Sequence, residues 1–212
     1  MGNPTVYGTP YSTYVRTTRI ALAEKRADYE LVDVNVLSGQ QKQPEHLARN
    51  PFGTVPAFAH DGFALYETGA IVRYIDQVFP GPSLTPDDAR ARARMNQIIS
   101  IVDFHAYPTM ISKIATNRIF MPLLGGSCDE AAVEGASAKA MLCLAEIERI
   151  LGDNAFLAGP ALSLADCYVV PVLHYLALTP EKSLIDARPR LAAWWQRINE
   201  VATVRETAPR LP

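Results

Sequence analysis

Two hydroxyl side chains stand where short β-type runs give way to helix-forming segments, and such positions suit anion chemistry. Ser12 follows the run Thr5-Val6-Tyr7-Gly8, and Thr68 follows the acidic Glu67 at a second junction of this kind. The first N–H groups of a helix lack intrahelical partners and its N-terminus carries partial positive charge, so a hydroxyl there helps to hold an anion. The same hydroxyl can act as a plain helix cap, and both roles stay open for Ser12 and Thr68.

The first 80 residues alternate strand and helix signals that would position these hydroxyls. The expected elements are, in order, a strand at 5–8, a helix at 15–25, a strand at 29–36, a hairpin with strands at 55–60 and 63–66, and a helix at 68–78. The first three form a β-α-β unit, whose two strands should be parallel. Asp61-Gly62 is a strong turn signal between the two hairpin strands.

The second part of the chain carries helix signals and no β-rich segment. Pro80-Gly81-Pro82-Ser83 is the clearest linker, so we predict domains at 1–80 and 89–212 joined by a linker at 81–88. A last helix is expected over about 189–201. Three helix starts should have a hydroxyl N-cap with an acidic residue three positions later, namely Thr85 with Asp88, Ser127 with Glu130 and Ser163 with Asp166.

Composition favours an ordinary globular protein with a small ligand. The 212 residues are 49% hydrophobic and 20% charged, with 20 basic against 22 acidic side chains and no run of like charge. We therefore expect no nucleic-acid partner and no membrane partner. Three cysteines without CxxC spacing, and the absence of a signal-like N-terminus, favour a reducing, cytoplasmic location. The four histidines have no metal-ligand spacing, so no metal is expected.

Four short motifs together carry a family resemblance that covers essentially the whole chain. They are Gly8-Thr9-Pro10-Tyr11-Ser12, Asn50-Pro51-Phe52-Gly53-Thr54-Val55-Pro56, Tyr66-Glu67-Thr68 and Ser163-Leu164-Ala165-Asp166. With the order of elements, they make the chain resemble the cytosolic glutathione transferase superfamily, most closely the serine-type phi class and its bacterial relatives. The resemblance implies an α/β thioredoxin-like N-terminal domain, β-α-β then β-β-α, followed by an all-α C-terminal domain.

The resemblance also implies that glutathione binds along the backbone at Val55 and Pro56. In such proteins this X–Pro bond is cis, and the backbone before the proline pairs with the cysteinyl main chain of glutathione like an added strand. Base rates for X–Pro bonds alone would favour trans. Thr54 stands here in place of a usual glutamine, so altered contacts are expected.

By the same resemblance, two further pairs of residues hold the ends of glutathione. Glu67 and Thr68 meet the γ-glutamyl end, with Thr68 in place of a more usual serine. Lys42, helped by Gln41, meets the glycyl carboxylate, and Gln41 replaces a usual histidine. For Lys42 alone, the alternative is a solvated surface lysine.

Within this family resemblance, Ser12 is the candidate activator of the glutathione thiol. A free thiol of this kind has a pKa of about 8.5 and is mostly protonated at neutral pH. A hydroxyl donor at a helix N-terminus favours the thiolate, so Ser12 would stabilise the sulfur anion rather than act as nucleophile. Tyr7 is the main rival, and Tyr11 and Tyr14 are lesser ones. The segment 8–15 contains no cysteine, which disfavours a mixed-disulfide mechanism.

The resemblance further implies a glutathione transferase that conjugates its thiol co-substrate to hydrophobic electrophiles in detoxification, acting as a homodimer. Phe52 and the helix starting at Pro86 are the interface candidates. The electrophile pocket is assigned to Tyr11, Phe104, His105, Tyr107, Met110 and Ile114, which could instead pack in the helical core. Alternative functions on this scaffold are a non-catalytic glutathione carrier and a glutathione-dependent isomerase or dehalogenase.

Overall fold

The computed structural model describes residues 2–209 and 211, and the chain divides into two compact units. Unit 1 comprises the residues up to Leu84 together with those from Val201 onwards, and unit 2 comprises Thr85–Glu200. Each unit has its own core.

Unit 1 contains a four-stranded mixed sheet in the order β2-β1-β3-β4. The strands are β1 (Thr5–Tyr7), β2 (Glu30–Val32), β3 (Ala57–His60) and β4 (Phe63–Tyr66). β1 runs parallel to β2 and antiparallel to β3, and β3 pairs with β4 in a hairpin. The predicted β-α-β unit and hairpin are therefore present, with strands shorter than the apolar runs suggested.

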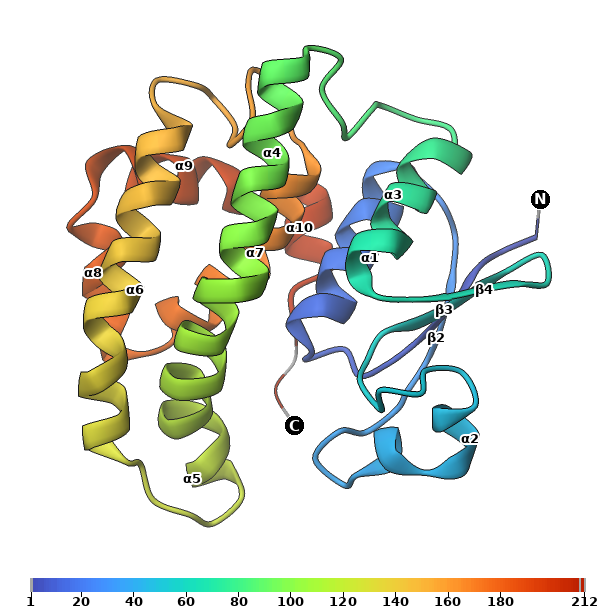
Figure 1. Cartoon of the computed structure of the whole chain (residues 1–212), viewed down its shortest axis with the longest axis horizontal. Helices are drawn as coiled ribbons and strands as arrows, with labels where there is room; N and C mark the ends of the chain where they lie inside the picture. The colour runs from blue at the N-terminus through green and yellow to red at the C-terminus, as the bar shows by residue number, and fades with distance from the viewer. Residues whose placement is uncertain (1, 210, 212) are drawn as a thin grey trace. The chain divides into compact units, whose positions relative to one another are not determined.

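Helices cover both faces of this sheet. In Figure 1, α1 (Thr13–Glu24) and α3 (Thr68–Val78) lie on one face, and the short α2 (Pro44–Leu47) lies on the other. A single 3₁₀ turn, η1 (Gln40–Lys42), precedes α2; neither of these two elements was predicted from the sequence. The apolar stripes of α1 and α3 are fully buried, with Ile20, Leu22, Ile71, Val72 and Ile75 at 0–1% exposure.

The last helix, α10 (Ala202–Glu206), belongs to unit 1 and packs on α1. The guanidinium of Arg16, which is 2% exposed, donates to the Val204 carbonyl at 3.0 Å. Arg19 donates to the Thr207 carbonyl at 3.4 Å, and the Thr203 hydroxyl donates to Glu24. A segment nearly 200 positions away therefore satisfies polar groups along α1.

A buried ion pair joins the C-terminal ends of α1 and α3. Lys25 Nζ lies 2.7 Å from Asp76 Oδ1, and their side chains are only 2% and 6% exposed. The same ammonium donates to the Pro82 carbonyl at 2.7 Å, and the Leu84 N–H donates to Asp76 at 2.8 Å. The pair thus also holds the segment that leads out of unit 1.

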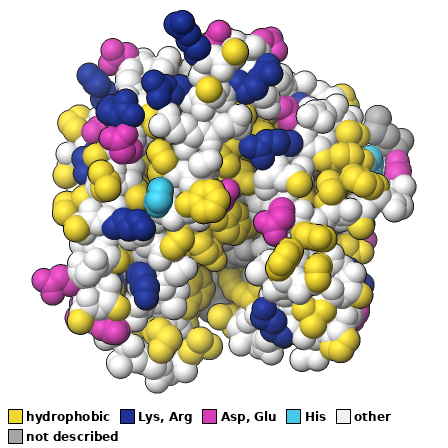
Figure 2. Space-filling view, in the orientation of Figure 1, with side chains coloured by type: hydrophobic (Ala, Val, Ile, Leu, Met, Phe, Trp, Pro, Cys, Tyr) yellow, Lys and Arg dark blue, Asp and Glu magenta, His cyan; other side chains and the backbone are white. Residues whose placement is uncertain are grey.

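Several large apolar side chains of unit 1 remain exposed. Phe52, before β3, is 65% exposed, while Phe63 and Tyr66 of β4 are 49% and 39% exposed. The rings of Phe52 and Tyr66 meet edge to face with centroids 5.9 Å apart. Figure 2 shows hydrophobic side chains gathered over this hairpin side of unit 1. Because β4 is an edge strand, this surface joins apolar area to unpaired strand backbone.

Unit 2 is helical, as predicted, and its described residues contain no β-strand. Its elements are α4 (Ala89–Ile101), η2 (Val102–Phe120), α5 (Met121–Leu123), α6 (Glu130–Leu151), α7 (Leu164–Ala177), η3 (Pro180–Lys182), α8 (Ser183–Asp186) and α9 (Pro189–Asn199). The expected last helix at 189–201 corresponds to α9, which stops before α10 begins in unit 1.

Two of the three predicted N-caps are wrong. α4 is capped by Asp88, which accepts from the Ala91 N–H at 2.8 Å, and not by Thr85. α6 is capped by Asp129, which accepts from the Ala132 N–H at 3.0 Å, and not by Ser127. Aspartate is as good an N-cap residue as serine, and its negative charge also interacts favourably with the positive N-terminal end of the helix. Each helix therefore begins directly after an aspartate, Asp88 or Asp129.

The third predicted cap is present and is tied into the core. Ser163 and Asp166 form a reciprocal capping box at the start of α7. Asp166, which is fully buried, also accepts from the Trp194 indole N–H at 2.9 Å and the Leu157 N–H at 3.0 Å. Burial is the largest influence on the Asp166 carboxyl and raises its pKa. The hydrogen bonds from Trp194 and Leu157 satisfy the Asp166 carboxylate away from water and so make its burial possible.

The helix η2 has the wide turn of a π-type helix and continues directly from α4 (Figure 1). Its last turn shows this register, because the Met121 N–H reaches the Thr116 carbonyl five residues back. Pro108 lies inside it and has no N–H to donate. Long π-type segments are rare and often occur at functional sites.

Candidate active site

The strand register gathers the loops that carry the sequence motifs at one end of the sheet. Tyr7, the last residue of β1, pairs with Val32 at the end of β2 and with Ala57 at the start of β3. Ala57 in turn pairs with Tyr66, the last residue of β4. The loop with Ser12, the loop after β2, the Val55–Pro56 bond and the Glu67 junction therefore all leave or enter the sheet at this end.

Gly8 is the point of closest approach between two of these loops. A Cβ atom at this position would lie 2.4 Å from Val15 Cγ2 and 3.2 Å from Val55 Cβ. Only glycine leaves room for the backbone here. The first turn of α1 and the residue before Pro56 are consequently packed against the end of β1.

Ser12 occupies the N-cap of α1. Its backbone is extended, with φ −72° and ψ 133°, and its Oγ accepts from the Val15 N–H at 3.4 Å. A hydroxyl can accept and donate at once, so this long cap bond leaves the O–H proton free to serve a nearby anion. Ser12 is half-buried, next to the positive end of a twelve-residue helix.

The Val55–Pro56 bond is cis, as the resemblance implied. Two side chains fix the residue before it: His46 Nε2 lies 2.8 Å from the Thr54 carbonyl, and Asn50 Nδ2 donates to the same oxygen at 2.9 Å. Because a carbonyl only accepts, His46 carries its proton on Nε2 here. Neither side chain was assigned a role from the sequence; Asn50 opens a motif, but His46 has no local signal.

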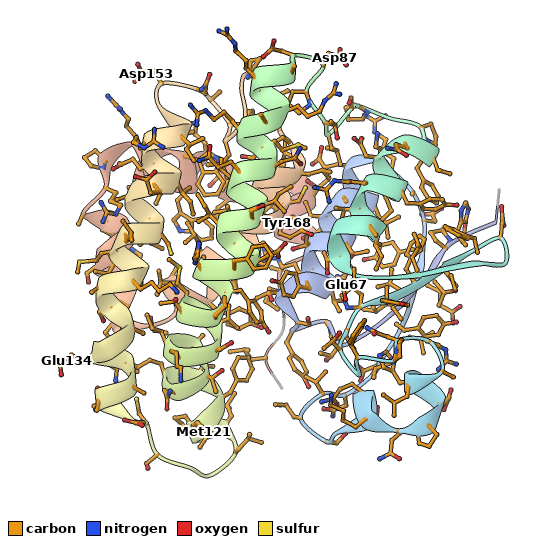
Figure 3. The ribbon with its side chains drawn as sticks, in the orientation of Figure 1. Glu67, Asp87, Met121, Glu134, Asp153 and Tyr168 are labelled. Carbon is orange, nitrogen blue, oxygen red and sulfur yellow. The ribbon has the colours of Figure 1, made fainter. Side chains whose placement is uncertain are left out.

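Glu67 and Thr68 lie where β4 runs into α3, and Figure 3 shows Glu67 at this junction. Glu67 has φ +68° and ψ 113°, an uncommon conformation for a residue with a side chain. Its carbonyl accepts from Ala70 and Ile71, so α3 starts at Thr68, whose side chain is almost buried. Strain of this kind is often kept at binding sites, because the surrounding structure must hold it.

Gln41 and Lys42 lie in the 3₁₀ turn η1, which follows β2 in the chain. Lys42 is exposed, and its ammonium donates to the Phe52 carbonyl at 3.2 Å. Gly53, with φ +60°, lies against the same side chain: a Cβ there would be 2.8 Å from Lys42 Nζ. An ammonium has three donors, so Lys42 can take an anionic ligand while it keeps this contact.

Tyr7 and Tyr11 are placed differently from Ser12. The guanidinium carbon of Arg49 lies 4.5 Å from the centroid of the Tyr7 ring, and Arg49 follows α2, which covers the other face of the sheet. Tyr11 is 8% exposed, and its hydroxyl donates to Asn35 Oδ1 at 2.9 Å.

The electrophile-pocket candidates of unit 2 all lie on η2 but differ in exposure. Phe104 is 72% exposed, His105 is exposed and Tyr107 is half-buried. Burial raises the pKa of the Tyr107 hydroxyl, which therefore stays protonated at neutral pH. Met110 and Ile114 are fully buried, in agreement with the alternative that they pack in the core.

Residues 2–209 and 211 contain neither a metal-binding cluster nor a membrane-spanning helix. No group of three or more His, Cys, Asp or Glu side chains is arranged to hold a metal ion. Across the same described part of the chain, every helix is too short or too polar to cross a bilayer.

The four-stranded mixed sheet with α1 and α3 on one face (Figure 1) defines unit 1 as a thioredoxin-like domain, and comparisons with other proteins identify its family. Residues 3–77 match the N-terminal domain of glutathione S-transferase, and residues 130–197 match the C-terminal domain. The chain is 35% identical over 192 residues to glutathione S-transferase F6 of Arabidopsis thaliana, covering 89% of this chain and 91% of the relative. It is 34% identical to glutathione S-transferase 1 of Zea mays, covering 96% and 94%.

Solved structures give the same answer. The apo structure of a glutathione S-transferase III has a TM-score of 0.89 and 35% identity, covering 100% of this chain and 99% of that one. The chain therefore belongs to the glutathione S-transferase family, enzymes that conjugate glutathione to electrophiles. The expected fold class, transferase activity and glutathione co-substrate are confirmed, and the plant F-series relatives confirm the likeness to the phi class.

Proposed function

We propose that this enzyme binds glutathione at the motif-bearing end of the unit 1 sheet and that Ser12 holds its sulfur as thiolate. The observation that carries the proposal is the strand register, which brings the Ser12 loop, the cis-proline backbone and the Glu67 junction to one end. The thiolate then attacks an electrophilic carbon and forms the C–S bond. In a substitution the leaving group departs with its electron pair, and in an addition the resulting carbanion takes up a proton.

The energetic requirement at Ser12 is modest. A thiol with a pKa of about 8.5 is only a few per cent ionised at pH 7, and a decrease of one to two units makes thiolate a major species. One hydrogen bond from the Ser12 hydroxyl to the charged sulfur, together with the partial charge of the α1 N-terminus, is of the right size for such a decrease.

The rest of unit 1 would hold the tripeptide by its polar ends. Residues Thr54, Val55 and Pro56 would offer backbone groups to the cysteinyl unit, in a loop already fixed by His46 and Asn50. Glu67 and Thr68, at the N-terminus of α3, suit the γ-glutamyl group. Lys42 supplies a cation for the glycyl carboxylate, with Gln41 beside it.

One contact supports Ser12 over Tyr7 as the activating residue, and a second supports it over Tyr11. The Tyr7 ring is covered by Arg49 on the α2 side of the sheet, whereas Ser12 starts α1 on the opposite side. Tyr11 is a weaker rival because its hydroxyl already donates to Asn35.

The deciding experiment compares Ser12→Ala, Ser12→Thr and Tyr7→Phe. The pKa of bound glutathione is measured by titrating the ultraviolet absorbance of the thiolate, and kcat/KM is measured with an aryl halide. Ser12→Ala should raise the bound thiol pKa by at least about one unit and lower kcat/KM near pH 6.5 by about 10-fold or more. Ser12→Thr should retain most activity and Tyr7→Phe nearly all. An unchanged thiol pKa in Ser12→Ala would overturn the assignment.

For the second substrate we propose a hydrophobic electrophile, met by the accessible side chains of η2. Phe104, His105 and Tyr107 have surface available for this contact. Counting glutathione consumed per turnover separates conjugation from an isomerase or dehalogenase that returns it. Binding to immobilised glutathione without turnover on any electrophile would point to a carrier.

We also propose a cytoplasmic homodimer with a role in detoxification. Cys128, Cys143 and Cys167 form no disulfide bond, which supports a reducing compartment. The exposed Phe52 ring beside edge strand β4 supports an interface on unit 1, and the helix that follows Pro86 is the second candidate. Light scattering should show a dimer for the wild-type chain and a larger monomer fraction for Phe52→Ser.

A further inference from the structure

Asn35, in the loop after β2, makes hydrogen bonds through both its side chain and its backbone, and neither the motifs nor the proposed function gives it a role in binding or chemistry. Its side-chain oxygen accepts from the Tyr11 hydroxyl at 2.9 Å, the Leu37 N–H at 3.0 Å and the Ser38 N–H at 3.2 Å. Its backbone N–H donates to Gln40 Oε1 at 2.9 Å, and its carbonyl accepts from the Gln40 N–H at 3.1 Å. The Ser38 hydroxyl also donates to that carbonyl at 3.1 Å.

These bonds connect two loops that are separate in the sequence. Tyr11 immediately precedes Ser12, so one end of the connection is the loop that starts α1. Gln40 begins η1, which contains Gln41 and Lys42, so the other end is the loop proposed to hold the glycyl carboxylate. Of these hydrogen bonds of Asn35, the bond from Tyr11 crosses between the two loops.

We propose that Asn35 is a positioning residue that sets the distance between the Ser12 loop and the η1 loop, and thereby the affinity for glutathione. The inference rests on the proposed function, because it assumes that these two loops bind opposite parts of one tripeptide. Asn35 touches no reacting atom in this scheme. It acts through Tyr11 on one side and through Gln40 on the other.

The effect should fall on binding more than on chemistry. Ser12 is fixed by α1, whose stripe is buried against α3 and α10, and this packing does not involve Asn35. The η1 loop is short, largely exposed and has no buried side chain of its own, so its position depends on hydrogen bonds. Losing the Asn35 acceptor would let Lys42 shift relative to Ser12, and a tripeptide bound at both ends would then bind more weakly.

The test uses the full-length enzyme and three substitutions. Asn35→Leu keeps the volume but removes the acceptor, Asn35→Asp keeps the accepting oxygen, and Tyr11→Phe removes the donor while keeping the ring. The measurements are the Kd for glutathione by calorimetry, KM and kcat with an aryl halide, the bound thiol pKa and the melting temperature.

Asn35→Leu should raise Kd and KM for glutathione about 10-fold, the size expected when a partly buried hydrogen bond loses one partner. The value of kcat should stay within about 3-fold and the bound thiol pKa should not move. Asn35→Asp should stay within about 3-fold of wild type in Kd. Tyr11→Phe should weaken binding about 5-fold, and the Asn35→Leu/Tyr11→Phe double variant should bind no worse than Asn35→Leu alone, because both remove the same bond.

Several results would overturn the proposal. One is a wild-type Kd in Asn35→Leu, another is an Asn35→Asp variant as weak as Asn35→Leu, and a third is a double variant whose loss is the product of the two single losses. If Asn35→Leu does not fold, Tyr11→Phe decides alone, and an unchanged Kd there counts against the proposal. A wild-type enzyme that binds no glutathione overturns the proposed function as well, whereas normal wild-type binding with unaffected variants overturns only the role of Asn35.

Discussion

Breaking the buried ion pair between Lys25 and Asp76 should be one of the most destabilising single changes in unit 1. The pair measures 2.7 Å, and both side chains are more than nine-tenths buried. Lys25→Met keeps the aliphatic packing of the lysine stem but leaves the Asp76 carboxylate with an uncompensated buried charge. The ammonium bond to the Pro82 carbonyl is lost in the same step.

Removing one partner of such a pair costs about 3–5 kcal/mol, because the remaining charge stays out of water. For a chain of this size, 1 kcal/mol corresponds to about 2–4 °C, so the melting temperature should fall by about 10 °C. Asp76→Leu should cost a similar amount, with the Leu84 N–H also losing its acceptor. The Lys25→Met/Asp76→Leu double variant should recover part of the loss, because it leaves no unpaired charge.

Urea unfolding of the wild type, both single variants and the double variant gives the four free energies of unfolding for this cycle. The reasoning predicts a coupling energy of at least about 2 kcal/mol between the two positions. It is refuted if Lys25→Met costs less than about 1 kcal/mol, or if the double variant loses the sum of the two single losses. Arg149→Met serves as control, because its ion pair with Glu146 is exposed to solvent and should contribute little to stability.

Two further outcomes are expected. Gly8→Ala should cost about 1–3 kcal/mol and weaken glutathione binding, because its Cβ would overlap Val15 and press on Val55; an unchanged melting temperature would contradict this. The hydrogen bond from Arg118 lowers the pKa of Glu130. The stability that this hydrogen bond contributes is therefore fully present above the ordinary carboxyl pKa of about 4.3. It is lost as the pH falls through the lowered pKa of Glu130 in the folded protein. In urea unfolding between pH 7 and 3, the wild-type advantage over Arg118→Met should shrink on acidification, and a widening gap would contradict the assignment.

The sequence predicted the elements of unit 1 well because its periodic signals are local. Asp61-Gly62 correctly marked the hairpin, and the stripe from Thr68 correctly marked α3 over its whole length, Thr68–Val78. The short elements η1 and α2 were missed, since three or four residues are too few to show a period. Pro44 at the start of α2 was the one available signal.

Contacts between distant residues could not be predicted in the same way. Ser163 and Asp166 were paired correctly from their spacing, but nothing local shows that Trp194 also donates to Asp166. The choice of Asp88 over Thr85 as the cap of α4 depends on where the preceding turn ends, and both residue types fit the rule. The roles of His46 and Asn35 likewise appear only after folding brings their partners near.

The return of α10 to α1 has a practical consequence for recombination between related enzymes. A graft that exchanges only the first 84 residues would separate Arg16, Arg19 and Glu24 from the carbonyls and hydroxyl that now satisfy them. The buried guanidinium of Arg16 would then lie against a C-terminal segment from another enzyme, and no hydrogen bond to the Val204 carbonyl would offset its desolvation. Chimeras built from both ends of the chain, with residues 201–209 travelling alongside the first 84, should fold where single-crossover hybrids do not.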